Sequence, residues 1–391
     1  MNLPLLRSAT AALDPPFGVI DATALDANVA DLVRRAAGKP IRLASKSVRV
    51  RQVLADTLRT NGYTGLLCYT LAEALWLHSK GFTDLVLGYP TVDRVGIAAL
   101  ADDVAAAAEI TLMVDDHAQL DLIDAVIPPS GRPSIRVAIE LDAGYRFGLL
   151  KFGALRSPIR TPSAAADLAR IIAGRRGFSL VGLMAYEGQI AGVGNTGGGP
   201  RGAIVRLMQA RSAAELAQRR SAVVAAVRET ADLEFVNGGG TGSLETTASE
   251  GSVTEVAAGS GLFGPGLFDH YGAFQPAHAA YFVLPVVRKP TRSVATLLGG
   301  GWVASGPVGP DRLPVIADPP GLRYVGVEGP GEVQTPLLGR AARRLQVGQH
   351  VWLRHAKAGE PAEHLNEFHI VRDGVITDVV PTYRGEGRAF L

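Results

Sequence analysis

Short apolar runs alternate with longer amphipathic segments between residues 23 and 259. Residues 23–37 repeat apolar side chains at helical spacing, from Leu25 to Val33, as a surface helix does. The short runs are apolar at nearly every position, which is typical of strands buried on both faces. The pattern predicts eight strands, at residues 41–45, 65–69, 84–88, 110–114, 135–142, 180–186, 233–237 and 253–259.

Helices are predicted between these strands, at residues 48–60, 71–80, 92–107, 116–126, 163–174, 203–230 and 243–249. Eight strand–helix units over roughly 230 residues match the size of a (β/α)8 barrel, about 250 residues. A doubly wound open sheet is the alternative α/β architecture. The count of eight favours the TIM-like barrel.

The chain changes character after residue 271. Short β runs divided by Gly and Pro replace the alternating pattern, and Asp373-Gly374 between two apolar runs is a strong hairpin signal. We expect a separate antiparallel β domain at 272–391. Residues 1–19 carry no predicted helix and are expected to join it, which leaves 20–271 for the barrel.

The composition limits the class of protein. The chain has 391 residues, 47% of them hydrophobic, which suits large buried cores and excludes a disordered or fibrous protein. A formal net charge of +2 gives no reason to expect a nucleic acid or an anionic membrane as partner. The single cysteine, Cys68, excludes a disulfide within the chain and a multi-cysteine zinc site. With no membrane-length apolar run and no evident signal peptide, we expect a cytoplasmic protein.

Lys46 directly follows the first predicted strand, in a chain with six lysines and 33 arginines. Functional groups of a barrel lie at the C-terminal ends of its strands. A partly desolvated lysine amine there is a nucleophile suited to Schiff-base formation. The alternative is a surface lysine that begins the next helix, and the strand-end position alone favours neither.

The fifth and sixth strands lead into further candidates. Arg146 lies in the segment Asp142-Ala143-Gly144-Tyr145-Arg146-Phe147-Gly148, where it is a candidate donor to an anionic oxygen. A solvated loop arginine is the more common case. Tyr186 and Gln189, after the sixth strand, are candidates for hydrogen bonds to a ring or a carboxylate.

The seventh and eighth strands lead into glycine-rich segments. Gly239, Gly240 and Thr241 follow the seventh strand, and Gly259-Ser260-Gly261 follow the eighth. Barrels often bind phosphate with the loops after these two strands, and glycine lets backbone N–H groups approach an anion. The alternative is a pair of glycine-rich turns in a chain that contains 46 glycines.

The C-terminal domain gathers histidines and carboxylates around residues 355–369. His355 and Lys357 are followed by Glu360, Glu363, His364, Glu367 and His369. Such a set of side chains is compatible with a metal site, and a polar loop between two strands is the alternative. No H-E-x-x-H motif is present.

Together these residues resemble the fold-type III pyridoxal phosphate enzymes, whose barrel is of the alanine racemase N-terminal type. The resemblance rests on the strand-end lysine, the Arg146 segment, the GGGTG and Gly-Ser-Gly loops and the opening Val19-Ile20-Asp21. The β-rich C-terminal domain is similar to the D-threonine aldolase / D-serine dehydratase branch. The HAKAGE segment and the tail at 383–387 resemble bacterial proteins labelled amino acid deaminase/aldolase.

The resemblance implies roles for the candidate residues. Lys46 would hold pyridoxal 5'-phosphate as a Schiff base and move the Cα proton, and Arg146 would contact the phenolic oxygen of its ring. Tyr186 would line the ring with Gln189 nearby, and Asp269 would take the acidic position after the phosphate loop. The residues implied for the phosphate are Gly239, Gly240, Thr241, Gly259, Ser260 and Gly261.

One position departs from the branch that the chain resembles. Its members bind a divalent metal through a His-x-Asp or His-x-Cys pair, whereas this chain has His355-Ala356-Lys357. An ammonium has no lone pair and cannot be a metal ligand. We hypothesise that Lys357 replaces the cation and that His355 acts as a general base on the substrate hydroxyl. The alternative is that Lys357 pairs with Glu360 or Glu363.

The resemblance favours a lyase, an aldolase or a dehydratase/deaminase, acting on D-3-hydroxy amino acids. An amino acid racemase or epimerase is an alternative that needs a second base, for which the C-terminal domain offers Tyr271, Tyr281, Tyr324 and Tyr383. A non-catalytic pyridoxal phosphate carrier and a Schiff-base aldolase of sugar phosphates are further alternatives. In this fold type the β domain closes the active site, often across a dimer, so we expect a homodimer.

Overall fold

A computed structural model describes residues 3–307, 309–357 and 359–391. The chain forms two compact units. The barrel unit contains Leu32–Lys46, Thr57–Gly259 and Phe390–Leu391, and the β-rich unit contains Met1–Asp31, Ser47–Asp56 and Ser260–Ala389. The domain boundaries expected from the sequence, 20–271 for the barrel and 272–391 with 1–19 for the β domain, stay a prediction.

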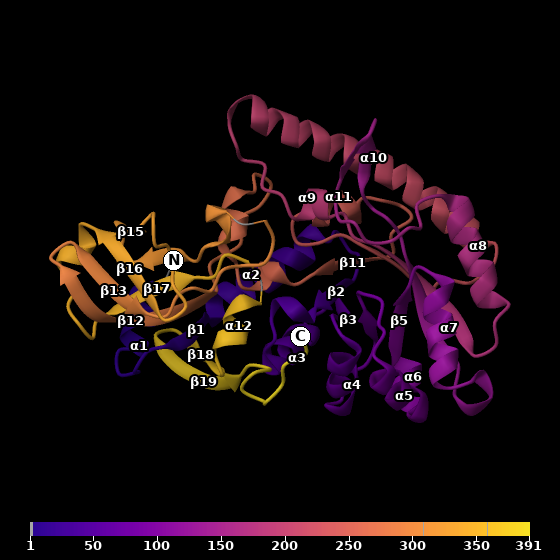
Figure 1. The fold of residues 1–391 in the computed structure, drawn as a ribbon, viewed down its shortest axis with the longest axis horizontal. Helices are drawn as coiled ribbons and strands as arrows, with labels where there is room; N and C mark the ends of the chain where they lie inside the picture. Colours follow the sequence, from indigo (N-terminus) through magenta and orange to yellow (C-terminus); the bar gives the residue numbers. More distant parts are fainter. Residues whose placement is uncertain (1–2, 308, 358) are drawn as a thin grey trace. The chain divides into compact units, whose positions relative to one another are not determined.

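Within the described residues, eight parallel strands close into a barrel in the order β10-β11-β2-β3-β4-β5-β6-β9 (Figure 1). Strand β11 pairs with β2 and closes the cylinder, so the (β/α)8 barrel is confirmed and the open sheet is excluded. The strands are β2 (Ile41–Ala44), β3 (Tyr63–Cys68), β4 (Leu85–Leu87), β5 (Ile110–Val114), β6 (Ile135–Glu140), β9 (Phe178–Ala185), β10 (Phe235–Gly238) and β11 (Glu255–Ala258).

Helices connect the barrel strands, and Figure 1 shows α4, α7 and α8 on the outside of the strands. A two-stranded hairpin, β7 (Tyr145–Phe147) and β8 (Leu150–Phe152), follows strand β6. The connecting helices are η1 (Ser45–Ser47), α3 (Arg51–Leu58), α4 (Leu71–Ser79), α5 (Arg94–Asp102), α6 (Val104–Glu109), α7 (His117–Val126), η2 (Pro129–Gly131), α8 (Pro162–Ala173), α9 (Gly188–Ala191), α10 (Gly199–Arg228) and α11 (Leu244–Ala248).

The single helix predicted at 92–107 is wrong in one respect, because the chain forms α5 and α6 there. Asp103 lies between them with extended backbone angles, and its carboxylate accepts a hydrogen bond from the N–H of Ala106 at 3.0 Å. An aspartate that caps a new helix ends the preceding one. The apolar spacing alone did not indicate this break.

The barrel interior is filled by side chains from several strands. Phe235 packs with Met113, Ala138 and Met184. A Cβ on Gly182 would lie 2.3 Å from the Phe235 ring. Glycine at this position of strand β9 therefore provides the space that the ring occupies.

The β-rich unit is built on a sheet with nine strands among the described residues. The central path is β15-β16-β13-β12-β1-β18-β19, and β17 pairs with β12 and β14. The predicted antiparallel domain is confirmed apart from one parallel pair, β1 with β18. The strands are β1 (Phe17–Asp21), β12 (Ala280–Thr291), β13 (Val294–Leu298), β14 (Val315–Asp318), β15 (Leu322–Tyr324), β16 (Gln334–Gly339), β17 (His350–Arg354), β18 (Glu367–Arg372) and β19 (Val375–Pro381).

Short helices complete the β-rich unit: α1 (Leu3–Ala9), α2 (Ala22–Arg35, which continues into the barrel unit), η3 (Ser260–Leu262), η4 (Gly266–His270), η5 (Pro310–Arg312), η6 (Ala341–Arg343) and α12 (Glu360–His364). The expectation of no helix in the first 20 residues is wrong. Helix α1 buries Leu6 against Phe17, Tyr281 and Trp352. Burial of one apolar side chain on the sheet stabilises a helix too short to form alone.

The hairpin predicted at Asp373-Gly374 is confirmed between β18 and β19. Asp373 has φ of 52° and Gly374 has φ of 80°. Two positive φ angles are the requirement of a type I′ turn, which explains the residue pair.

Candidate active site

Lys46 lies at the C-terminal end of barrel strand β2. The strand ends at Ala44, and η1 places Lys46 just beyond it. The amine of Lys46 contacts the hydroxyl of Tyr89, which comes shortly after strand β4 ends at Leu87. Because the carboxyl ends of parallel barrel strands lie at the same end of the cylinder, this contact places the amine in the barrel mouth.

Tyr89 has an electrostatic environment that favours ionisation of its hydroxyl. Burial raises the pKa of Tyr89, but the charges of Lys46 and Arg156 and the hydrogen bonds from both lower it. The net result is a pKa below the ordinary value of 10.0. A phenol between two cations is stabilised as the phenolate.

Arg156 follows the β7–β8 hairpin and lies between two aromatic rings. Its guanidinium carbon is 5.1 Å from the ring centre of Tyr89 and 4.9 Å from that of Tyr186. Its Nη1 is 3.5 Å from Oε1 of Glu140, the last residue of strand β6. Burial of Glu140 outweighs the charge of Arg156 and raises the pKa of this carboxyl to about 7.

Tyr186 follows strand β9 directly, and its ring packs against two glycines. An added Cβ would lie 3.1 Å from the ring at Gly240 and 3.2 Å from it at Gly188. Burial raises the pKa of Tyr186 to about 12, so its hydroxyl stays protonated at neutral pH. The two glycines let the backbone approach the ring closely.

Glu187 is a buried carboxylate that holds the glycine-rich loop after strand β10. It accepts hydrogen bonds from the N–H of Gly239 at 3.2 Å, the hydroxyl of Ser243 at 3.1 Å, the hydroxyl of Thr247 and the guanidinium of Arg220 at 3.2 Å. Several donors on one buried carboxylate fix the position of the segment that carries them.

The predicted phosphate loop after β10 already has hydrogen-bond partners in the protein. The N–H of Gly239 donates to Glu187, and the N–H of Gly240 donates to Ser243 at 3.2 Å. The carbonyl of Thr241 accepts from Arg35 at 2.6 Å. The N–H of Gly240 is thus engaged within the loop and that of Gly239 by Glu187 outside it, and the phosphate role of Gly239, Gly240 and Thr241 stays a prediction.

Gly259, Ser260 and Gly261 follow strand β11. The chain passes there from the second segment of the barrel unit, Thr57–Gly259, into the β-rich unit. Ser260 begins η3, and Gly261 is buried within it. Their phosphate role stays a prediction.

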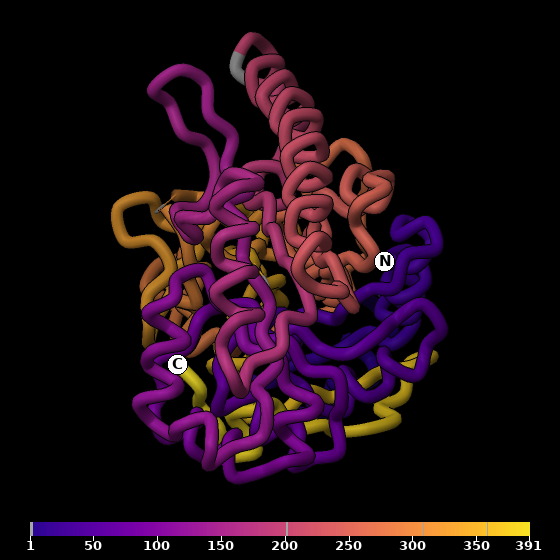
Figure 2. Tube along the Cα trace, turned by 90° about the vertical axis from the view of Figure 1, so that its right-hand side faces the viewer, coloured from indigo at the N-terminus to yellow at the C-terminus, as the bar shows by residue number. Residues whose placement is uncertain are grey.

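Arg146 lies on the β7–β8 hairpin, which projects beside helix α10 (Figure 2). Its Nη2 is 3.9 Å from Oδ2 of Asp142, and its side chain is 55% exposed. The arginine that contacts Tyr89 is Arg156. Two arginines of the same segment after β6 thus have different surroundings.

Gln189 is buried at the start of the segment that leads to helix α10. Its amide nitrogen donates to the carbonyl of Ala143 at 2.7 Å and to the hydroxyl of Ser212 at 2.8 Å. These bonds tie the segment after β6 to helix α10. The ring contact expected of Gln189 stays a prediction.

His355 and Lys357 follow strand β17 in the β-rich unit. His355 is buried, and neither ring nitrogen has a hydrogen-bond partner among the described residues. Burial and the charge of Arg354 lower the pKa of His355 to about 3, so the imidazole is neutral at physiological pH. The Lys357 ammonium is 3.3 Å from the carbonyl of Ser305. Its charge opposes the burial that raises the pKa of Glu360 to about 7.

No group of three or more His, Cys, Asp or Glu side chains in the described part of the chain is arranged to hold a metal ion. The metal role considered for His355 stays untested.

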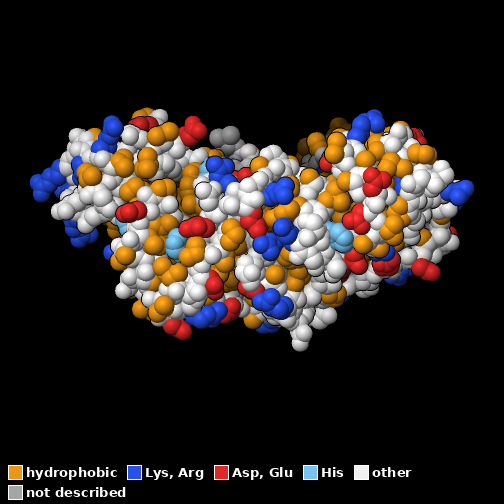
Figure 3. Space-filling view, turned by 90° about the horizontal axis from the view of Figure 1, so that it is seen from below, with side chains coloured by type: hydrophobic (Ala, Val, Ile, Leu, Met, Phe, Trp, Pro, Cys, Tyr) orange, Lys and Arg blue, Asp and Glu red, His pale blue; other side chains and the backbone are white. Residues whose placement is uncertain are grey.

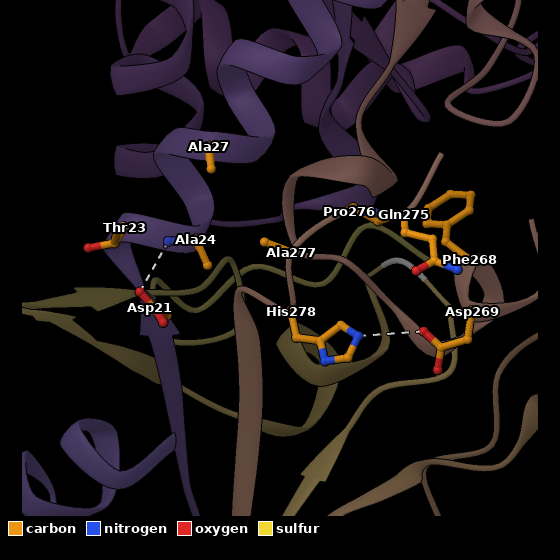
Figure 4. A pocket seen from close by; sticks show the side chains of 10 residues that line it. All are labelled: Asp21, Thr23, Ala24, Ala27, Phe268, Asp269, Gln275, Pro276, Ala277 and His278. Carbon is orange, nitrogen blue, oxygen red and sulfur yellow. Dashed lines mark hydrogen bonds and ion pairs between the residues drawn. The ribbon is translucent and has the colours of Figure 1, made fainter. Parts of the chain in front are cut away.

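Asp269 lines a pocket of about 620 Å³ in the β-rich unit (Figure 4). Its carboxylate is 3.6 Å from Nε2 of His278 and receives a bidentate pair of bonds from Arg354, at 2.8 and 3.0 Å. Burial opposes these partners, but their hydrogen bonds and charges hold the pKa of Asp269 well below its usual range. The other lining residues are Asp21, Thr23, Ala24, Ala27, Phe268, Gln275, Pro276 and Ala277.

The four tyrosines considered as a second base all lie in the β-rich unit. Tyr271, Tyr281 and Tyr383 are buried, and the hydroxyl of Tyr324 donates to the carbonyl of Pro314 at 2.8 Å. Burial raises the pKa of Tyr281 to about 12. Burial also raises the pKa of Tyr324.

The molecular surface is mixed in character. Basic and acidic side chains are interspersed on the face in Figure 3, as the small net charge suggests. None of the helices in the described ranges has the length and apolarity that crossing a membrane requires.

The fold and the site define a class: a (β/α)8 barrel that presents a lysine amine at the end of strand β2, with aromatic rings and a guanidinium beside it. Residues 20–266 match the family "Alanine racemase, N-terminal domain", and the chain belongs to this family. The resemblance to fold-type III pyridoxal phosphate enzymes is thereby confirmed.

Two curated relatives are similar in sequence. The chain is 27% identical to a D-threonine aldolase of Arthrobacter sp over 387 residues, 94% of this chain and 92% of that protein. It is 26% identical to a 3-hydroxy-D-aspartate aldolase of Paracoccus denitrificans (strain Pd 1222) over 256 residues, 64% of this chain and 60% of that protein.

Solved structures are similar in fold. The D-threonine aldolase from Filomicrobium marinum has a TM-score of 0.79 at 23% identity, over 95% of each chain. The D-threo-3-hydroxyaspartate dehydratase from Delftia sp. HT23 has a TM-score of 0.75 at 20% identity, over 96% of this chain and 98% of that chain. The β-rich unit is thus part of the shared fold.

Three residues of the site were not predicted from the sequence: Tyr89, Arg156 and Glu187. Tyr89 comes immediately after the predicted strand 84–88, so inspecting the end of every strand would have found it. Glu187 carries the same signal, because it directly follows the predicted strand 180–186, whereas Arg156 had no such signal. Arg156 is brought to the mouth by the path of the chain after a hairpin, and Glu187 acts on a loop distant in sequence.

Proposed function

We propose that the chain is a pyridoxal phosphate-dependent lyase that cleaves or dehydrates D-3-hydroxy amino acids, with Lys46 as the imine-forming amine. The observation that carries the proposal is the position of the Lys46 amine in the mouth of an alanine racemase-type barrel, in contact with Tyr89. The names of the relatives, D-threonine aldolase and 3-hydroxy-D-aspartate aldolase, support the substrate class.

The residues around Lys46 fit an aromatic, anionic cofactor. When bound, pyridoxal 5'-phosphate supplies an electron-withdrawing ring that stabilises the carbanion left by a broken Cα bond. Tyr186 offers a neutral aromatic face, and Gly240 leaves room beside it that a Cβ would fill. The proposal keeps both glycine-rich segments, 239–241 and 259–261, as the phosphate site.

We propose that Arg156, and not Arg146, supplies the guanidinium beside the cofactor ring. Arg156 lies 4.9 Å from the ring centre of Tyr186, whereas Arg146 pairs with Asp142 on an exposed hairpin. Replacing each arginine with methionine distinguishes them. We expect Arg156→Met to weaken cofactor binding by at least about 10-fold, and Arg146→Met to leave it within about 2-fold. If Arg146→Met weakens cofactor binding more than Arg156→Met does, the guanidinium beside the cofactor belongs to Arg146.

The choice between aldol cleavage and dehydration depends on which proton is removed. A base that takes the proton of the β-hydroxyl leads to cleavage, and removal of the Cα proton with loss of the hydroxyl leads to dehydration. The proposal assigns removal of the β-hydroxyl proton to His355. This residue is a neutral imidazole, and neither of its ring nitrogens has a hydrogen-bond partner among the described residues. It assigns the charge that a metal supplies in the related branch to the Lys357 ammonium.

The cofactor and the lysine are tested together. Purified protein should absorb visible light. Borohydride should bleach this colour by reducing the imine, which leaves the cofactor attached to Lys46 as a label. Lys46→Ala should lose both, while Lys80→Ala, which changes an exposed lysine at the end of helix α4, should retain both. An active Lys46→Ala enzyme would contradict the proposal.

The reaction is tested by its products on a panel of D- and L-3-hydroxy amino acids. Glycine plus an aldehyde indicates an aldolase, and a keto acid plus ammonia indicates a dehydratase. The mirror-image amino acid would indicate a racemase, and no product would indicate a carrier. If Lys357 replaces the metal, chelator treatment should leave the rate unchanged, and a metal-restored rate would refute that role.

The expected cytoplasmic homodimer is part of the same proposal. Light scattering of the purified holoprotein tests the assembly, because a dimer has twice the mass of the 40.9 kDa chain.

A further inference from the structure

Tyr89 is a candidate for a chemical role that the sequence alone did not suggest. It lies at the barrel mouth just beyond strand β4, and its hydroxyl contacts Nζ of Lys46. We propose that Tyr89 is a catalytic residue that exchanges a proton with Lys46 Nζ. This inference rests on the proposed function, in which Lys46 Nζ is a reacting atom.

The contact between the two side chains is made at the oxygen of Tyr89. Lys46 Nζ is 5.1 Å from the ring centre and hydrogen-bonds the hydroxyl. Arg156 hydrogen-bonds Tyr89 as well, with its guanidinium carbon 5.1 Å from the ring centre. Tyr89 therefore has two cationic neighbours, and one of them, the amine of Lys46, contacts its hydroxyl.

The proton balance of the exchange is complete within this pair. A lysine ammonium has no lone pair and is neither a nucleophile nor a base. When the phenolate of Tyr89 takes a proton from it, one N–H bond breaks and one O–H bond forms, which leaves a neutral amine and a neutral phenol. The reverse transfer restores both charges, and no co-reactant is consumed. Arg156 stabilises the phenolate half of the cycle.

The second tyrosine beside Arg156 differs from Tyr89 in this respect. Burial raises the pKa of Tyr186 to about 12, with Arg156 opposing the shift, whereas the two cations lower the pKa of Tyr89. Glu140, 3.5 Å from Arg156, is the carboxylate partner of the same guanidinium. Of the two tyrosines at Arg156, Tyr89 is the one whose surroundings favour the phenolate, the form that can take a proton.

The test begins with the cofactor-free protein, so that it does not depend on the proposed cofactor. Ultraviolet titration of the wild type should show one tyrosine that ionises below the ordinary value of about 10. Tyr89→Phe should remove this transition, and Lys46→Met should move it to higher pH. Tyr63→Phe is the matched control, because Tyr63 begins strand β3 at the opposite end of the barrel. The transition should persist in Tyr63→Phe.

The loaded enzyme gives the second readout. Tyr89→Phe should lower kcat by about 100-fold and remove one limb of the kcat pH profile, while borohydride still labels Lys46. Tyr63→Phe should behave as the wild type. A residue that only positions Lys46 would change KM or cofactor loading and leave the shape of the pH profile intact, and that result would overturn the inference.

The outcomes separate the inference from the proposed function. A low-pH tyrosine transition that survives in Tyr89→Phe, or a Tyr89→Phe enzyme with wild-type kcat at every pH, overturns the role of Tyr89 alone. A wild-type protein that carries no borohydride label on Lys46 overturns the proposed function and the catalytic exchange with it. If Tyr89→Phe does not fold, the Lys46→Met titration decides: an unmoved transition overturns the inference.

Discussion

Replacing Glu187 with alanine removes the acceptor that holds the glycine-rich loop after β10. The substitution leaves the N–H of Gly239 and the hydroxyls of Ser243 and Thr247 without their carboxylate partner. It also leaves Arg220, whose side chain is 1% exposed, with one carboxylate instead of two. Both effects act inside the barrel unit.

The magnitude follows from the burial of this charge pair. Breaking a buried pair by removing one partner costs about 3–5 kcal/mol, because the other charge stays buried. Arg220 retains Glu250, with Nη1 2.5 Å from Oε2, so the charge contribution should lie near about 3 kcal/mol. Each donor that loses its acceptor adds about 1 kcal/mol. Because three such donors lose their acceptor, we expect Glu187→Ala to lower the free energy of unfolding of the barrel by about 6 kcal/mol.

Urea unfolding followed by circular dichroism measures the change, and cofactor titration measures the effect on the loop. Glu229→Ala is the matched control, because Glu229 is exposed at the end of helix α10, in the same unit as Glu187. Glu187→Gln keeps an oxygen acceptor without the charge and should fall between the two. If Glu187→Ala unfolds at the same urea concentration as Glu229→Ala, the carboxylate does not hold the loop.

Three further variants test other parts of the structure. Gly182→Ala places a Cβ 2.3 Å from the Phe235 ring and should cost about 1–3 kcal/mol in urea unfolding, part of which Phe235→Leu should restore. Leu6→Ala should cost about 2–5 kcal/mol, because Leu6 is buried on the sheet of the β-rich unit, and an unchanged stability would show that helix α1 is dispensable. Glu140 has a folded-state pKa raised by burial from 4.5 to about 7, so its contribution to stability is full below pH 4.5 and is lost as the pH rises through 7. Glu140→Gln should therefore match the wild type in free energy of unfolding below pH 4.5 and exceed it by about 3 kcal/mol above pH 7. Parallel curves of stability against pH for the two proteins would refute the raised pKa.

The barrel could be predicted because its signal is local and repeated. Each buried parallel strand must be apolar on both faces, and each connecting helix must be apolar on one, so eight alternations remain visible in the sequence. The helix break at Asp103 was missed because one capping carboxylate competes with an otherwise continuous apolar spacing. Helix α1 was missed because its formation depends on packing on strands that are distant in sequence.

The candidate site likewise contains residues that the sequence indicated and contacts that it could not indicate. Lys46 was a candidate from its position at a strand end, which is a property of consecutive residues, and the resemblance to a known family implied its role; its placement in the mouth follows from the parallel strands. Which side chain contacts Lys46 could not be predicted, because Tyr89 follows a different strand of the closed cylinder and Arg156 in turn contacts Tyr89.

By itself, the amino-acid sequence determined the order of the barrel strands, the β-rich second part and the position of the candidate lysine, Lys46, at a strand end. Only the tertiary structure decided which cation faces the rings, Arg156 beside Tyr186 while Arg146 pairs with Asp142, and which hydroxyl contacts the amine of Lys46. The physical reason is range: backbone preference and apolar periodicity act over a few residues, whereas hydrogen bonds and charges at the end of a barrel join side chains that only closure of the cylinder brings together.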